Sequence, residues 1–100
     1  MKLTDIAKVI RSKNAGPTTL TLDILFNDEA GYQRALQAPS LQPSAIAPLY
    51  GLRAEQVQLI PYPPAIAIKI AMDRTTVAGN PGDRDVYGAQ QHGPLLEIEV

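Results

Sequence analysis

An alternating run of residues near the start of the chain limits the possible folds more than any other feature. Between Thr18 and Phe26, apolar side chains occupy every second position. One side of the run carries Leu20, Leu22, Ile24 and Phe26, and the other carries Thr19, Thr21, Asp23 and Leu25. A period of two is that of a β-strand with one buried face. The run therefore predicts a half-buried strand with β-branched residues on its outer side.

Helical periodicity appears on both sides of this strand. In residues 3–13, Leu3, Ile6, Ala7 and Ile10 follow the i, i+3, i+4, i+7 spacing of an apolar stripe, which predicts a helix. Residues 14–17 (Asn-Ala-Gly-Pro) contain the residue types that end a helix. Two more helices are predicted, one capped by residues 27–28 and running to about Gln37, and a short one from Pro43 to Gly51.

Three further strands are predicted at residues 57–62, 65–72 and 95–100. Pro61 places the first of them at a sheet edge, because proline cannot donate a ladder hydrogen bond. In the second, the outer side carries only small residues and one lysine, Ala65, Ala67, Lys69 and Ala71. Small side chains allow another surface to pack closely there.

Helices and strands mix without strict alternation, which favours the α+β class. We expect a single domain over residues 1–100, with a sheet of about four strands and helices packed on one face. The best match in topology is a variant of the ferredoxin-like fold. At 100 residues, the chain has the length of one domain.

Composition excludes several classes of protein. A net charge of −1 gives no basis for nucleic-acid binding. No apolar run approaches the roughly 20 residues of a membrane helix, and the N-terminus lacks the apolar core of a signal peptide. The absence of cysteine excludes disulfides, thiolate metal sites and a cysteine nucleophile. We therefore expect a cytoplasmic protein.

A stretch of about twenty residues after Asp73 has no apolar period, and loops of this length are usually functional or disordered. Its composition favours an ordered loop. Three residues can act as general acid or base, namely Asp85, Tyr87 and His92. A recognition patch is a further interpretation, formed by Arg84, Tyr87, Gln90, Gln91 and His92, because arginine and tyrosine are enriched at binding hot spots. In the structural alternative, Asp83 and Asp85 only fix the loop to Arg11, Lys13 or the backbone.

Two other functions for this loop receive less support. Asp83, Asp85 and His92 have the ligand chemistry of a divalent cation site, but Arg84 between the carboxylates would neutralise them, and EF-hand spacing is missing. The glycine-rich stretch matches neither the P-loop nor the dinucleotide-binding pattern. We therefore expect no metal and no cofactor.

A second candidate segment covers residues 11–17, where Arg11, Lys13 and Asn14 can bind an anion or a partner's carboxylate. The alternative is an ordinary helix C-terminus with favourable charges. If the strands that follow the two candidate segments are parallel neighbours, both segments lie at the same end of the sheet.

The same segments carry a family resemblance. Residues 5–17, 22–26 and 81–92 resemble the signature blocks of the domain of unknown function 4387 family, across essentially the whole chain. The resemblance implies a domain of this size, encoded beside or fused behind a larger protein similar to the acyclic terpene utilisation protein AtuA. It also implies a catabolic setting that involves organic acids or acyl-CoA compounds. It supplies no established reaction and no catalytic residue.

Together these observations favour a small subunit of a heteromeric enzyme complex. Its loops would complete or cap a partner's active site for a lyase, hydratase or isomerase reaction on an organic acid or its thioester. In that arrangement Arg11, Lys13 or Arg84 holds a substrate carboxylate, and His92, Tyr87 or Asp85 transfers a proton. Two alternatives stay open: a non-catalytic scaffold, and a self-contained homo-oligomeric enzyme.

Overall fold

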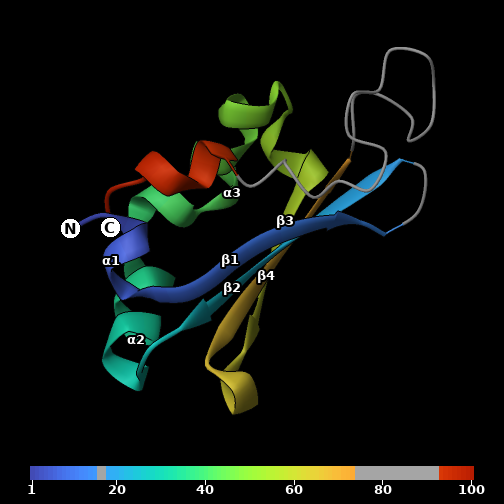
Figure 1. Ribbon diagram of the computed structural model, residues 1–100. Helices are drawn as coiled ribbons and strands as arrows, with labels where there is room; N and C mark the ends of the chain where they lie inside the picture. The colour runs from blue at the N-terminus through green and yellow to red at the C-terminus, as the bar shows by residue number, and fades with distance from the viewer. Residues whose placement is uncertain (16–17, 74–92) are drawn as a thin grey trace.

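The computed structural model describes residues 1–15, 18–73 and 93–100. Its four strands and three α-helices follow one another along the chain with short 3-10 turns between them (Figure 1). In chain order the elements are α1 (Leu3–Ile6), β1 (Ala7–Asn14), β2 (Thr19–Phe26), α2 (Glu29–Gln37), η1 (Pro39–Leu41), α3 (Pro43–Ile46), η2 (Ala47–Tyr50), η3 (Ala54–Gln56), β3 (Val57–Tyr62), η4 (Pro63–Ala65), β4 (Ala67–Asp73) and η5 (Gly93–Glu97).

The four strands form one antiparallel sheet in the order β1-β2-β4-β3. Strands β2 and β3 both run antiparallel to β4, which lies between them, so they point in the same direction. A pair of parallel strands that is joined through helices and separated by a third strand is the split β-α-β unit of ferredoxin-like folds. Strand β1 completes the sheet beyond β2, and it comes from the N-terminal part of the chain. The α+β class and the four-stranded sheet are therefore confirmed.

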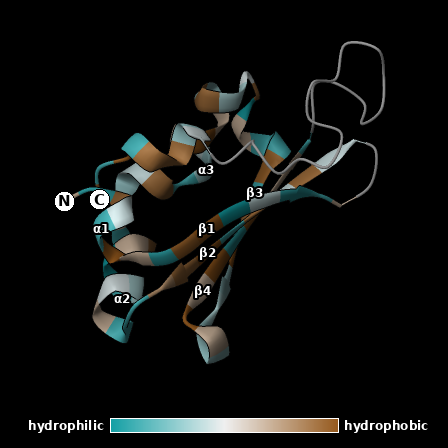
Figure 2. Ribbon diagram, viewed as in Figure 1, coloured by the Kyte–Doolittle hydropathy of each residue, from teal (hydrophilic) through white to brown (hydrophobic). Residues whose placement is uncertain are grey.

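The core lies between the sheet and the helices, which gather on one side of the sheet (Figure 1). Alternate residues of β2 and β4 supply the sheet side of this core, while Leu3, Tyr32, Leu41 and Ile46 enter it from the helical side. Hydrophobic positions recur along the strands and along the helices above them (Figure 2). In the described part of the chain, no helix is long and apolar enough to span a membrane.

Several sequence predictions are confirmed closely. The alternating run forms β2, and β3 is an edge strand over the predicted residues 57–62. Gly51 ends the third helical segment in the left-handed conformation, with φ of 69°, which glycine adopts without steric cost. Strand β4 begins at Ala67, two residues later than predicted, because the prolines after Tyr62 start the η4 turn.

The predicted helix over residues 3–13 is wrong beyond Ile6. Helix α1 is a single turn, and residues 7–14 form β1, which pairs with β2 from Ala7 opposite Phe26 to Asn14 opposite Leu20. The apolar spacing fitted a helix, but pairing with β2 gave these residues an antiparallel ladder, irregular only between Ala7 and Val9. Tertiary pairing overrode the weak local preference.

The predicted C-terminal strand over residues 95–100 is also wrong. Residues 93–97 form the 3-10 turn η5, and Leu95 and Ile98 are the buried residues of this segment. Their spacing of three fits a 3-10 turn, whereas a strand would bury every second residue. The fourth strand of the sheet is therefore β1, and the proposed pair of parallel neighbouring strands does not exist.

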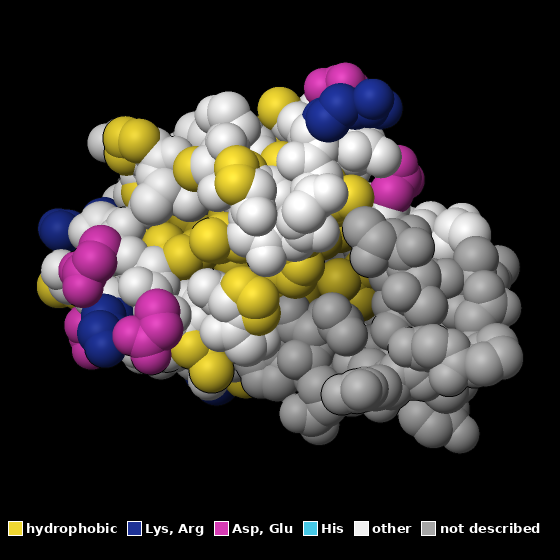
Figure 3. All heavy atoms as spheres, turned by 90° about the horizontal axis from the view of Figure 1, so that it is seen from above, with side chains coloured by type: hydrophobic (Ala, Val, Ile, Leu, Met, Phe, Trp, Pro, Cys, Tyr) yellow, Lys and Arg dark blue, Asp and Glu magenta, His cyan; other side chains and the backbone are white. Residues whose placement is uncertain are grey.

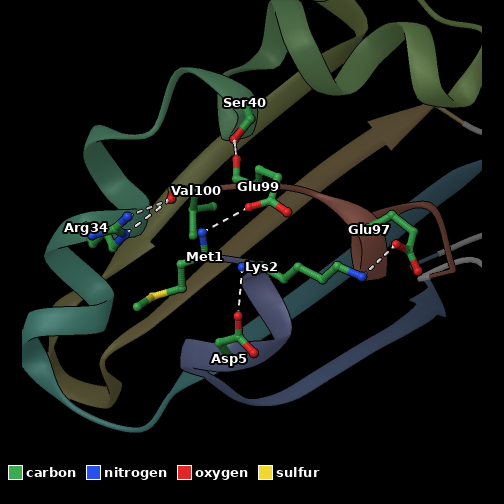
Figure 4. Close-up of polar contacts among 8 residues, drawn as sticks. All are labelled: Met1, Lys2, Asp5, Arg34, Ser40, Glu97, Glu99 and Val100. Atoms are coloured by element: carbon green, nitrogen blue, oxygen red, sulfur yellow. Dashed lines mark hydrogen bonds and ion pairs between the residues drawn. The ribbon is translucent and has the colours of Figure 1, made fainter.

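The two chain ends lie side by side and are joined by polar contacts (Figure 4). The Leu3 amide donates to the Ile98 carbonyl and the Val100 amide donates to the Met1 carbonyl, both at 2.8 Å. Lys2 Nζ donates to Glu97 Oε2 at 3.1 Å, and this contact raises the pKa of Lys2. Ser40 Oγ donates to the Glu99 carbonyl oxygen. In the space-filling view, acidic and basic side chains gather at one margin of the molecule (Figure 3).

Helix α2 has a side-chain cap whose contribution can be measured. Asp28 Oδ1 accepts a hydrogen bond from the Gly31 amide at 2.8 Å. We expect Asp28→Ala to lower the free energy of unfolding by about 1 kcal/mol, because this amide then loses its partner. Asp28→Asn keeps a capping oxygen and serves as the control. Urea unfolding of the three proteins tests this, and equal destabilisation by both substitutions would contradict it.

Candidate functional site

One face of the sheet carries no described α-helix, and we call it the open face. Strand register defines it, because side chains that are opposite one another across antiparallel strands share a face. Three rows cross the sheet from β1 through β2 and β4 to β3. These rows are Lys13-Thr21-Ala71-Gln58, Arg11-Asp23-Lys69-Ile60 and Val9-Leu25-Ala67-Tyr62.

The middle row concentrates charge. Asp23 is half-buried on β2, between Arg11 on one side and Lys69 on the other. Arg11 Nε lies 3.5 Å from Asp23 Oδ2, so these two side chains form an ion pair across the β1–β2 hairpin. Lys13 lies in the next row on the same strand as Arg11, and the Thr21 hydroxyl donates to the Lys13 carbonyl oxygen at 3.3 Å. Three cations and one carboxylate make this part of the face positive.

The row that contains Tyr62 is apolar, and Ile60, at the β3 end of the middle row, extends its apolar surface. Tyr62 is 56% exposed and Ile60 is 39% exposed, both on the edge strand β3. Leu25 and Ala67 continue this surface toward the centre of the sheet and are half-buried. An apolar row beside a positive row gives the open face two chemically distinct halves.

A depression of about 500 Å³ lies where the two halves meet. Its lining includes the three cations and Asp23, together with apolar residues of β2, β3, β4 and the turn between β3 and β4. The apolar lining residues are Leu25, Ile60, Pro61, Tyr62, Ala65, Ala67 and Ile68. Ala67 of β4 and Ala65 of the η4 turn are among these lining residues, and their small side chains leave room in the depression.

The turn at the rim of the depression has an unusual backbone. Ile66 adopts the left-handed conformation with φ of 43°, which β-branched residues rarely occupy. Pro63 precedes it in the η4 turn, and the Ile66 amide donates to the Pro63 carbonyl at 3.0 Å. The Ile66 carbonyl in turn accepts from the Phe26 amide at 3.0 Å, so the turn is held against the end of β2.

The structure places only part of the predicted site. Arg11 and Lys13 lie on the open face, as strand residues and not at the end of a helix as predicted. Asn14 is one residue further along and lies opposite Leu20, so it belongs to the other side of the sheet. The remaining candidates lie outside the described residues: Asp83, Arg84, Asp85, Tyr87, Gln90, Gln91 and His92.

Sequence reasoning missed Asp23, Lys69 and Tyr62 as site residues. The signal was available for the first two, since each interrupts the outer side of an alternating strand that is otherwise small or uncharged. A charge on the outer side is usually read as ordinary solvation. Only the strand order shows that Asp23 and Lys69 are direct neighbours.

The described residues of the open face have the chemistry of an anion-binding surface. They include no histidine and no cysteine, and no group of three metal-ligating side chains occurs anywhere in the described residues. Ammonium and guanidinium groups bind anionic oxygens through charge-assisted hydrogen bonds. Tyr50, whose pKa is raised by burial, belongs to the η2 turn and does not line the depression.

Comparison with known proteins covers nearly the whole chain. The family described as "Domain of unknown function (DUF4387)" matches residues 3–99, a span that contains all four strands and the open face. No curated protein matches the chain, and no solved structure matches it. The resemblance that three sequence blocks carry is thus confirmed for the family itself. The chain belongs to this family of domains of unknown function.

Proposed function

We propose that this protein is a cytoplasmic small subunit that docks onto a larger AtuA-like protein through its open face. The resulting complex would be a lyase, hydratase or isomerase that acts on an organic acid or an acyl-CoA compound. Arg11 and Lys13 hold a carboxylate at the shared interface. Proton transfer falls to the sequence candidates His92, Tyr87 and Asp85, with Arg84 as a further anion-binding group.

The observation that carries the proposal is the open face itself. It combines exposed apolar side chains, Ile60 and Tyr62, with three cations around one carboxylate. Interfaces are enriched in tyrosine and arginine and surround an apolar centre with polar groups. Ligand sites also form preferentially where two domains or subunits meet. A depression on a sheet face that no described α-helix covers becomes such a site when a second chain closes it.

Co-expression of this chain with an AtuA-like protein encoded beside it tests the docking step. We expect the two chains to elute together at a fixed ratio in size-exclusion chromatography. Tyr62→Asp places a charge in the apolar row and should abolish co-elution. Leu49→Asp is the matched control, because Leu49 is 46% exposed on the η2 turn, which lies outside the open face.

The outcomes separate the alternatives. Separate elution of the wild-type chains would contradict docking, and equal effects of Tyr62→Asp and Leu49→Asp would place the contact elsewhere. Urea unfolding of both variants controls for loss of structure. Co-elution of the wild-type chain that Tyr62→Asp abolishes supports the subunit interpretation over a self-contained enzyme.

A further inference from the structure

The charges of the depression are not balanced among the described residues. Arg11 pairs with Asp23 at 3.5 Å, whereas no described carboxylate forms an ion pair with Lys13 or Lys69. The lining therefore holds three positive charges and one negative charge, all within one depression of about 500 Å³. An excess of positive charge in a hollow attracts an anion more strongly than the same charges on a flat surface.

The cations are placed so that their end groups can converge. Arg11 and Lys69 are separated only by Asp23 on β2, so their backbones are about 10 Å apart across the sheet. Lys13 shares the strand and the face of Arg11. Lysine and arginine side chains extend well above the sheet, and three of them around one point can bind the oxygens of a single anionic group.

The apolar half of the depression borders this cationic half directly. Ile60 lies opposite Lys69, and the next row carries Tyr62, Ala67 and Leu25. A ligand that contacts both halves of the depression needs an anionic head and an apolar body of a few carbons. The volume lies within the range of roughly 300–1,000 Å³ that small-molecule sites occupy.

We propose that the depression binds a small amphipathic anion, with its anionic oxygens on Lys69 and Lys13 and its apolar chain against Tyr62 and Leu25. Carboxylates and phosphate monoesters share this chemistry. The biological role of this binding rests on the proposed function, because docking would enclose the ligand between two chains. Binding itself needs only this chain, because every residue used belongs to it.

Isothermal titration of the isolated full chain tests the proposal with four probes: hexanoate, hexyl phosphate, hexanol and inorganic phosphate. We expect one of the two amphipathic anions to bind at least about tenfold more tightly than hexanol, because hexanol lacks the charge-assisted hydrogen bonds. Tighter binding of hexanoate identifies a carboxylate site, and tighter binding of hexyl phosphate identifies a phosphate-ester site. Inorganic phosphate should bind weakly, since it leaves the apolar half empty.

Two variants test whether the anion binds in the depression. Lys69→Gln should weaken binding of the preferred anion about tenfold, from the loss of one charge-assisted hydrogen bond. Lys8→Gln is the control, because Lys8 is exposed on β1 and does not line the depression. Three results would each overturn the proposal. They are equal affinity for hexanol and both anions, equal effects of the two variants, and absence of binding at millimolar concentration. Co-elution with the larger chain that persists in Lys69→Gln would show that docking stands without the anion site.

Discussion

Ile68→Asp should abolish the cooperative unfolding transition of this protein at neutral pH. Ile68 is 1% exposed on β4, opposite Ile24 on β2, in the middle of the sheet side of the core. The described core cluster around it is made of hydrophobic residues, so burial of an unpaired carboxylate there costs about 3 kcal/mol or more. That cost is a large part of the roughly 5–15 kcal/mol that stabilises a domain.

The matched control is Ile60→Asp on the neighbouring strand β3. Ile60 is 39% exposed and lies on the open face, so an aspartate there stays hydrated. We expect a loss of at most about 1 kcal/mol from the lower strand preference of aspartate. Circular dichroism during urea unfolding measures both variants. A stable, cooperatively folded Ile68→Asp protein would contradict the assignment of the two faces of the sheet.

Leu95→Ala should lower the free energy of unfolding by about 2–5 kcal/mol, as expected for a large-to-small change in a packed core. Leu95 is 0% exposed and belongs to the η5 turn near the chain end. Its neighbour Leu96 is 37% exposed, so Leu96→Ala should change stability by no more than about 0.5 kcal/mol. Thermal and urea unfolding of this adjacent pair test the fold of the C-terminal segment directly.

The pair also separates the two structures considered for this segment. A strand over residues 95–100 would place Leu96, Ile98 and Val100 on one side and would make Leu96 the costly substitution. In the structure, Leu95 in the 3-10 turn and Ile98 just after it are the buried residues. A larger effect at Leu96 than at Leu95 would therefore contradict the turn.

The central elements of the fold were predictable from sequence because their signals were local. The alternation before Phe26, the cap at Asp28 and the left-handed Gly51 each specify a conformation within a few residues. Pro61 likewise identifies an edge strand from its own chemistry. Such features need no knowledge of the neighbouring elements.

The two wrong elements lie at the chain ends, where distant contacts decide the structure. Residues 7–14 became a strand because β2 pairs with them. At the other end, residues 93–97 form a turn, and Ile98 and Val100 after it hydrogen-bond to Leu3 and Met1. The apolar periodicity of a short segment contains no information about such distant partners. Short apolar patterns at chain ends are therefore the least informative part of this sequence.

The candidate site was predictable in part for the same reason. Arg11 and Lys13 stood out as a pair of cations, although on the wrong type of element. Asp23 and Lys69 are distant in the chain, and only the pairing of β2 with β4 makes them neighbours. A site assembled across strands becomes visible once the register is known.

The position of β4 between β2 and β3 has a consequence for the folding pathway. The β1–β2 and β3–β4 pairs each join strands that are close in the chain, so they close small loops and can form early. The β2–β4 pair joins the two halves and must close a long loop that contains all the helices between them. Such non-local pairing raises the contact order and slows folding. Docking of two preformed hairpins is thus the expected rate-limiting step, and the depression on the open face takes shape only when that step is complete.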